Sequence, residues 1–274
     1  MSSRSQSRLP NIGRVRSRCP SLHDIPDCGK RKPLNLSPEA SYQAESMSEE
    51  ITGEDYYGGH SWGARFRRAR LEKLVLPMLE DISRRKGNVR ILDLGGNVQY
   101  WEPILADLRR LDCRVSLLNL SNDLMHKHRQ ADSCFEFLTG DARRCNFPDN
   151  NFDLVHSNSV IEHVGTWTDM QAMANEVRRL APLYYLQVPN FWFPMEPHFR
   201  KLFFHWLPEQ VRARMVLRRA LGFMPKASSY SEAMTIVESA RLLEQGQLAE
   251  LFPDSTISKE RVFGLAKSLI AIRR

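Results

Sequence analysis

The chain has 274 residues, of which 42% are apolar and 26% charged, and it carries a formal net charge of +7. These proportions are typical of a globular protein and exclude a chain that is disordered throughout. No run approaches the roughly 18 consecutive apolar residues of a membrane span, and the first 20 residues lack the apolar centre of a secretory signal, so we expect no transmembrane segment.

Residues 1–50 are rich in Ser, Arg and Pro and show little apolar periodicity, which predicts a disordered basic tail. The five cysteines are scattered and odd in number, so we expect free thiols and a cytoplasmic location. Cys19, His23 and Cys28 lie near one another in the tail, but they lack a fourth ligand, and no metal site is predicted.

The positive charge raises the question of nucleic-acid binding. Much of the excess lies in the tail and on predicted helices, where Arg is a good helix former. The sequence contains no helix-turn-helix pattern, zinc-finger spacing or RNA-binding aromatic motif. Nucleic acid is therefore disfavoured as a partner, although an RNA, DNA or protein substrate stays open as an alternative.

Residues 51–274 are predicted to form one α/β domain. Apolar residues at helical spacing predict a helix over 62–83, and short apolar runs bounded by turn residues predict strands. In chain order the predicted strands are 89–94, 115–120, 135–138, 152–157 and 184–188, the predicted helices between them are 101–111, 123–130 and 168–180, and a last strand pair is predicted at 261–264 and 267–272. This alternation predicts a doubly wound, Rossmann-like, mostly parallel sheet with helices on both faces and a closing antiparallel strand pair.

The connection between the fifth strand and the closing pair is dense in aromatic residues. They recur from Pro189 to Leu207, and helices are predicted at 211–221, which is basic and amphipathic, and at 240–251. We expect residues 190–235 to form a helical lid that selects the substrate. A small subsidiary core is the alternative, and both can hold together. A basic helix beside aromatic residues is also compatible with contact to a membrane surface.

Glycines and polar residues follow four of the predicted strands. In parallel sheets ligands bind beyond the carboxyl ends of the strands, at the point where the strand order reverses. The residues at these ends are Asp93, Gly95, Gly96 and Asn97 after the first strand, Asn119 after the second, Asp141 after the third, and Ser157, Asn158 and Ser159 after the fourth. Each alone can be a turn or a helix cap, but their joint occurrence in this order favours a binding site.

The most distinctive segments are Ile91-Leu-Asp-Leu-Gly-Gly96, Thr139-Gly-Asp-Ala142 and Phe152-Asp-Leu-Val-His-Ser-Asn-Ser-Val-Ile-Glu-His-Val164. They resemble the class I methyltransferases that use S-adenosylmethionine (SAM), specifically the broad small-molecule group called type 11, and the resemblance covers about 89–274. It implies SAM as the cofactor. By this resemblance Gly95 and Gly96 line the methionine portion of SAM, Asn119 and Leu120 lie along the ribose, and Asp141 and Ala142 contact the adenine. Ser157 and Asn158 close the pocket. Asp93 and Asn97 complete the predicted cofactor-binding set.

Two departures from the pattern of that family bear on cofactor binding. The glycine loop of the family usually reads Gly-x-Gly-x-Gly, whereas Asn97 and Gln99 stand here at the later glycine positions. Its second strand usually ends in an acid that binds both ribose hydroxyls, whereas this chain has Asn119, which makes weaker, neutral hydrogen bonds. A non-catalytic, methyltransferase-like binding module therefore stays open. Nicotinamide binding is disfavoured, because the Gly-x-Gly-x-x-Gly fingerprint is absent.

The reaction that the resemblance implies is in-line displacement of the methyl group from the sulfonium of SAM, in which the protein mainly aligns the nucleophile, carbon and sulfur. A base is needed only for an acceptor that loses a proton. Glu162 and His163 follow the fourth strand and are the predicted catalytic residues, with His198 and His205 as further candidates. The sequence thus predicts methyl transfer to a small or lipid-like acceptor, and it leaves the acceptor and the oligomeric state open.

Overall fold

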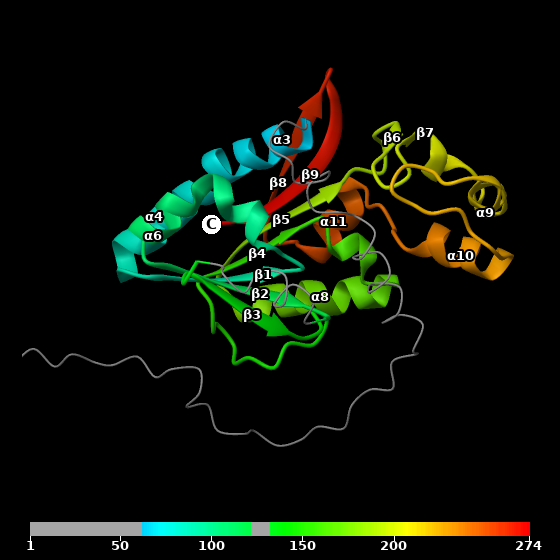
Figure 1. Cartoon of the computed structure of the whole chain (residues 1–274). Helices are drawn as coiled ribbons and strands as arrows, with labels where there is room; N and C mark the ends of the chain where they lie inside the picture. Colours follow the sequence, from blue (N-terminus) through cyan, green and yellow to red (C-terminus); the bar gives the residue numbers. More distant parts are fainter. Residues whose placement is uncertain (1–61, 122–131) are drawn as a thin grey trace, which may run out of the picture. The chain divides into compact units, whose positions relative to one another are not determined.

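A computed structural model describes residues 62–121 and 132–274. The predicted tail 1–50 and the predicted helix 123–130 lie outside these described residues. The strands are β1 (Val89–Leu94), β2 (Cys113–Asn119), β3 (Phe135–Thr139), β4 (Leu154–Asn158), β5 (Leu183–Pro189), β6 (Met195–Glu196), β7 (Lys201–Leu202), β8 (Thr256–Val262) and β9 (Leu265–Arg273). The first five and the last two form a seven-stranded sheet in the order β3-β2-β1-β4-β5-β9-β8, and β6 pairs separately with β7 (Figure 1).

The strand directions confirm the predicted architecture. Strands β1 to β5 pair in parallel, whereas β9 runs antiparallel to both β5 and β8. The strand order reverses between β1 and β4, because successive crossovers place β2 and β3 on one side of β1 and β4 and β5 on the other. The sheet is therefore doubly wound, with its topological switch point between β1 and β4.

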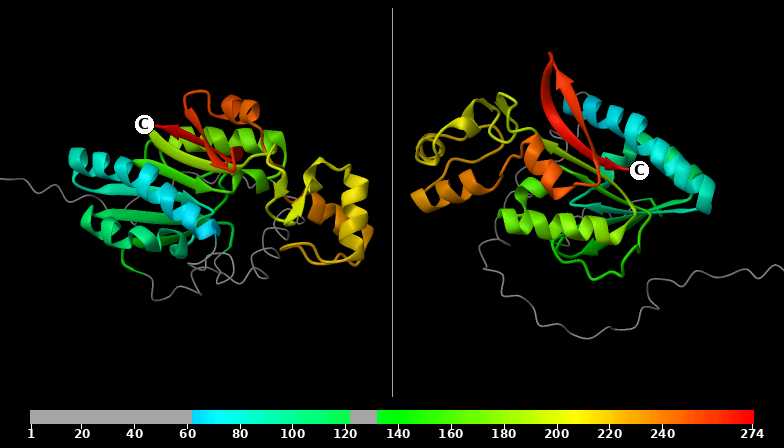
Figure 2. Two further views of the ribbon diagram at one scale, coloured as in Figure 1. Left: turned by 90° about the horizontal axis from the view of Figure 1, so that it is seen from above. Right: turned by 180° about the vertical axis from the view of Figure 1, so that it is seen from behind.

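Helices cover both faces of the sheet (Figure 2). They are α3 (Trp62–Arg70), the π-helical turn η2 (Leu71–Val75), α4 (Leu76–Lys86), α5 (Val98–Trp101), the 3₁₀ turn η3 (Glu102–Ile104), α6 (Leu105–Arg110), the 3₁₀ turn η4 (Ile161–His163), α8 (Trp167–Leu180), the 3₁₀ turn η5 (Phe204–Trp206), α9 (Glu209–Arg218), α10 (Tyr230–Glu238) and α11 (Gln245–Leu251). The apolar sides of η2, α4, α5 and α6 form one core with the sheet, and those of α8 and α11 form another on the opposite face. Since both faces are covered, strands such as β1 are buried almost throughout, as their apolar runs predicted.

Several element boundaries differ from the sequence prediction for local reasons. The predicted helix 101–111 is broken into α5, η3 and α6, and Pro103, which has no backbone N–H, lies in η3 at the break. The predicted helix 240–251 begins only at Gln245, and α10 was not predicted. The closing strands are longer than predicted because β8 is the exposed edge of the sheet and shows little continuous apolar pattern.

Residues 190–243, here called the insertion, connect β5 to α11 and contain β6, β7, η5, α9 and α10. The insertion has its own small apolar core, in which Phe199 and Phe204 stack with ring centroids 4.1 Å apart and pack with Val216 and Val237. The predicted subsidiary core is thus present, whereas the role of residues 190–235 as a lid stays a prediction. Within the described ranges, no helix combines the length and apolar character that crossing a bilayer requires.

Candidate functional site

The carboxyl ends of β1 to β4 lie level with one another along one edge of the sheet. Leu94 at the end of β1 is in register with Leu118 of β2 and Ser157 of β4, and Asn119 is in register with Thr139 of β3. Ladder hydrogen bonds continue into the loops, from the Gly95 amide to Leu118 at 2.8 Å and from the Gly140 amide to Asn119 at 2.9 Å. The four strand ends that the sequence assigned to the cofactor are therefore side by side along this edge, on both sides of the switch point.

The turn after β1 is fixed by glycine geometry and by a buried acid. Gly95 has a φ of +66°, and a Cβ on Gly96 would overlap the Asp93 carboxylate. That carboxylate is buried, accepts from Trp101 Nε1 at 2.7 Å and lies 2.7 Å from Nδ1 of His156. The Asp93 carboxylate therefore packs against the glycine turn, and both of its oxygens form contacts with other side chains.

The two asparagines at this edge also hold the turn. Asn97 caps α5, because its Oδ1 accepts from the Tyr100 amide at 3.0 Å. Asn119, which replaces the acid usual in the family, donates from Nδ2 to the Gly96 carbonyl at 3.0 Å. The amide side chain thus joins the end of β2 to the loop after β1, a bond that a carboxylate could not donate. The next residue, Leu120, is 50% exposed.

Asp141 is half-buried after β3 and forms a bidentate ion pair with Arg143, whose Nη2 lies 2.7 Å from Asp141 Oδ2 and whose Nε lies 3.0 Å from both oxygens. Arg143 also reaches Asp169 at 3.0 Å on α8. Burial opposes the charged form of Asp141, but the hydrogen bonds and charge of Arg143 outweigh it, and the pKa of Asp141 is lowered. Sequence reasoning missed Arg143, although its position two residues after the acid was a visible signal.

Ser157 and Asn158 end β4 in different environments. The Ser157 hydroxyl is buried and has no hydrogen-bond partner among the described residues. The Asn158 Oδ1 accepts from Arg70 Nη2 at 2.9 Å, and the same guanidinium pairs with Glu260 of β8 at 2.9 Å. Arg70 belongs to α3, 88 residues before Asn158, and no local sequence pattern announces this contact.

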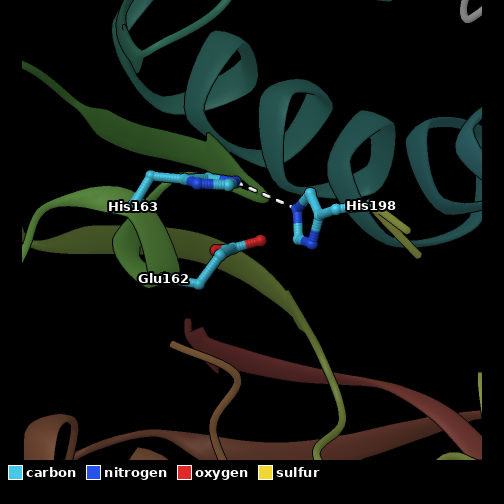
Figure 3. A group of neighbouring side chains, drawn as sticks. All are labelled: Glu162, His163 and His198. Atoms are coloured by element: carbon cyan, nitrogen blue, oxygen red, sulfur yellow. Dashed lines mark hydrogen bonds between the residues drawn. The ribbon is translucent and has the colours of Figure 1, made fainter. Parts of the chain in front are cut away.

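The predicted catalytic residues Glu162 and His163 form part of η4, immediately beyond the switch point. The neighbouring Val160 lies against the glycine turn, since a Cβ on Gly95 would come within 2.6 Å of its Cγ2. The structure adds His198 from the insertion, whose Nε2 lies 3.1 Å from Nε2 of His163 (Figure 3). His205, the other candidate base, is bonded through Nε2 to the Phe191 carbonyl at 2.7 Å and is not part of this cluster.

Hydrogen bonds on the outer side of the cluster fix both imidazoles. Nδ1 of His163 lies 2.8 Å from the Ser239 carbonyl, and Nδ1 of His198 lies 2.7 Å from Oε1 of Glu196. Glu196 is buried and also accepts from the Phe199 amide. Sequence reasoning missed Glu196, because its contact with His198 depends on how the insertion folds.

Burial and charge give the three cluster residues different protonation behaviour. Burial raises the pKa of Glu162 to about 7. Burial and the neighbouring His198 lower the pKa of His163 to about 3. Burial opposes the charged form of His198, but the hydrogen bond and charge of Glu196 outweigh it and raise its pKa. Perturbed groups of this kind cluster at functional sites.

The doubly wound sheet, with polar side chains at the strand ends beside its switch point, defines a Rossmann-like fold, and ligands of such folds bind at this edge of the sheet. A family model described as a methyltransferase domain matches residues 92–182, from within β1 to beyond the end of α8. This span holds the strand-end loops after β1 to β4 and nearly all of the three segments on which the sequence resemblance depends. Residues 92–182 therefore match a methyltransferase domain, in agreement with the resemblance that the sequence predicted.

Solved structures with a similar fold share little sequence with this chain. A Rhodobacter sphaeroides protein, provisionally named a zinc-dependent alcohol dehydrogenase, superposes with a TM-score of 0.55 at 10% identity and covers 86% of this chain and 98% of its own. Magnesium protoporphyrin IX methyltransferase from Synechocystis, with bound SAM, gives 0.49 at 12% identity and covers 88% and 100%. The PH0226 protein of Pyrococcus horikoshii gives 0.47 at 18% identity and covers 81% and 95%. A search among proteins of curated function found no significant match to the chain.

Proposed function

We propose that this domain transfers the methyl group of SAM to a small or lipid-like acceptor, with the cofactor along the carboxyl ends of β1 to β4 and the acceptor beside the insertion. The convergence of four strand-end loops at the switch point carries this proposal, because ligands of doubly wound sheets bind there. The location that we infer is cytoplasmic, in keeping with Cys113, Cys134 and Cys145, which are free thiols.

The proposed cofactor contacts follow from the atoms that each loop presents. Gly95 and Gly96 allow the backbone to approach the methionine portion closely, because neither carries a side chain there. Nδ2 of Asn119 is committed to Gly96, so Oδ1 is the atom that would accept from a ribose hydroxyl. Asp141, held in place by Arg143, would accept from the adenine amino group, with Ala142 beside it. Ser157 and Asn158 would close the pocket, as the sequence predicted.

In the proposed reaction a lone pair of the acceptor attacks the methyl carbon as the carbon–sulfur bond breaks. Its electron pair returns to sulfur, and S-adenosylhomocysteine leaves. An acceptor hydroxyl must also lose its proton, and Glu162 and His163 are the proposed groups for this task. Both belong to the turn that lies against the glycine loop, and both Glu162 oxygens lack a hydrogen-bond partner among the described residues.

The nature of the acceptor is inferred from the insertion. Trp192 is 60% exposed, and Phe203 and Trp206 are also exposed, with ring centroids 5.1 Å apart. Exposed aromatic side chains gathered on one segment are typical of a surface that meets an apolar ligand or a membrane interface. An apolar small molecule or a lipid-linked molecule is the acceptor class that such a surface fits.

The direct test is transfer of label. Isotopically labelled SAM is offered to cell extract together with the purified full chain, and the labelled product is identified. We expect a labelled apolar small molecule, strongly reduced labelling with Asp141→Ala at SAM concentrations below the Kd of that variant, and normal labelling with Asp149→Ala, which removes an exposed acid outside the site. Labelled RNA, DNA or protein would contradict the acceptor class that we propose.

One observation favours a non-catalytic binding module as the second candidate. Asn119 and Asp141 both form hydrogen bonds within the chain, which leaves fewer of their donor and acceptor atoms for a cofactor. Calorimetric titration with SAM separates the two candidates. Binding followed by release of S-adenosylhomocysteine supports an enzyme, whereas binding without turnover in any extract supports a binding module.

A further inference from the structure

Glu162, His163 and His198 bring together the donor atoms of a metal site. One carboxylate oxygen and one nitrogen from each imidazole all lie within 4.8 Å of one another. The two histidines are 35 residues apart in sequence, and the fold of the insertion brings them together. Figure 3 shows the Glu162 carboxylate directed toward His198, with the two imidazoles meeting edge to face.

The outer hydrogen bonds determine where the lone pairs of the two imidazoles point. A carbonyl oxygen can only accept, so Nδ1 of His163 carries the hydrogen that it donates to Ser239. Nδ1 of His198 likewise donates to the Glu196 carboxylate. In the neutral rings both lone pairs are therefore on Nε2, and these two atoms face each other. A carbonyl and a carboxylate behind two imidazoles are the outer-shell partners that metal-binding histidines usually have.

The two Nε2 atoms attract each other only when a positive charge lies between them, which either a proton on Nε2 of His198 or a metal ion supplies. The Nε2 atoms are 3.1 Å apart. Two nitrogens bound to one zinc ion at its usual bond length lie about 2.9–3.4 Å apart for ligand angles between about 90° and 110°. The observed separation falls in this range, so the distance between the two nitrogens is compatible with one ion bound to both.

Glu162 supplies the third ligand. Its side chain is buried at 1% exposure, and neither oxygen has a hydrogen-bond partner among the described residues. A buried carboxylate without partners is costly unless a cation or hydrogen bonds compensate its charge. Because neither oxygen is engaged, binding an ion at the two nitrogens would not cost Glu162 a hydrogen bond.

We propose that Glu162, His163 and His198 bind one divalent transition-metal ion, for which zinc is the best fit to two imidazoles and one carboxylate. Three protein ligands leave a coordination position for water or substrate. The ion would tie the insertion to the turn after β4. This inference concerns metal binding and does not rest on methyl transfer. If methyl transfer is also correct, the ion would lower the pKa of an acceptor hydroxyl on the open position, and solvent rather than the ligated Glu162 and His163 would take its proton.

Cobalt(II) is the probe that tests the site, because its visible spectrum reports its ligands. The full chain is stripped with a chelator, dialysed and titrated with Co²⁺ in the absence of SAM and acceptor. We expect one Co²⁺ per chain, displaced by one Zn²⁺, with an oxygen- and nitrogen-type spectrum. Glu162→Gln and His198→Gln should each weaken binding at least tenfold, and Zn²⁺ should raise the Tm of the parent chain but not of His198→Gln.

Two controls separate this site from other ligands in the chain. His205→Gln removes an insertion histidine outside the cluster and should leave Co²⁺ binding unchanged. The double variant Cys19→Ser, Cys28→Ser removes the thiols of the tail and should also bind normally. Circular dichroism of each metal-free variant checks that it is folded. Absence of Co²⁺ binding, or binding that survives both cluster variants, would overturn the proposal whatever the result of the SAM titration.

Discussion

At the carboxyl edge of the sheet, the polar side chains assigned to the cofactor are bonded to other parts of the chain, whereas on the insertion large aromatic side chains lie exposed. Asn119 is held by Gly96 and Asp141 by Arg143, but Trp192 and Phe203 are 60% and 48% exposed. The first region is therefore built before a ligand arrives, which lowers the entropic cost of binding. The second presents exposed aromatic surface that a ligand can cover, and this difference is consistent with the separate roles that we propose for the two regions.

The largest effect is expected from a substitution in the glycine turn at the carboxyl edge of the sheet. In Gly96→Ala the new methyl group would overlap the Asp93 carboxylate, which Trp101 and His156 hold in place. Since that carboxylate cannot retreat, we expect a loss of about 3 kcal/mol in the free energy of unfolding and no measurable SAM binding. Chemical denaturation and calorimetry measure both. Gly246→Ala, where a methyl group has ordinary contacts, should be neutral; equal stability of the two variants would refute the prediction.

A smaller effect is expected when one cofactor contact is removed while the fold is kept. Asp141→Ala deletes a charged acceptor, and such hydrogen bonds contribute about 1.5–3 kcal/mol, so the Kd for SAM should rise by roughly 10–100-fold. Calorimetric titration gives this value. An unchanged Kd would place the adenine elsewhere.

Substitutions in the insertion should change the KM for the acceptor rather than the Kd for SAM. The double variant Trp192→Ala, Phe203→Ala removes exposed aromatic surface, and we expect the KM for the acceptor to rise about tenfold, while the Kd for SAM stays the same. Steady-state kinetics with the identified acceptor makes this measurement. Phe263→Ala removes an aromatic ring that is 95% exposed at the β8–β9 turn and should change neither value. A change in SAM affinity alone would mean that the two regions are not separate.

The smallest expected effect is the loss of stability at acid pH. Because Arg143 lowers the pKa of Asp141 in the folded chain, the pair stabilises the fold above the unfolded-state pKa of about 4 and loses this contribution as the pH falls through the folded value. The partly exposed pair contributes about 1 kcal/mol at most. The unfolding free energies of the parent chain and Asp141→Asn should therefore differ at pH 7 and converge as the pH falls below the unfolded-state pKa of about 4. The unfolding free energy of Arg143→Met should approach that of the parent chain over the same pH range. A difference that does not change with pH would show that the ion pair does not titrate as described.

Sequence reasoning located the sheet because β1 and β5 contain short apolar runs bounded by turn residues, which are typical of strands buried on both faces. It also identified residues at the loops of one edge, since parallel strands must end together. It could not predict that Asn119 donates to Gly96 or that Arg70 reaches Asn158, because these bonds depend on distances across the fold. Their roles toward SAM and the roles of Glu162 and His163 stay predictions.

By itself the sequence determined the class of the protein, because strand periodicity, glycine turns and the segments after β1, β3 and β4 are local properties of the chain. Only the tertiary structure decided how the edge is held together and what the insertion contributes. His198 meets His163 and Glu162 through the packing of a segment with its own core. No pattern along the chain encodes such a meeting, because it depends on how two separately packed cores are joined.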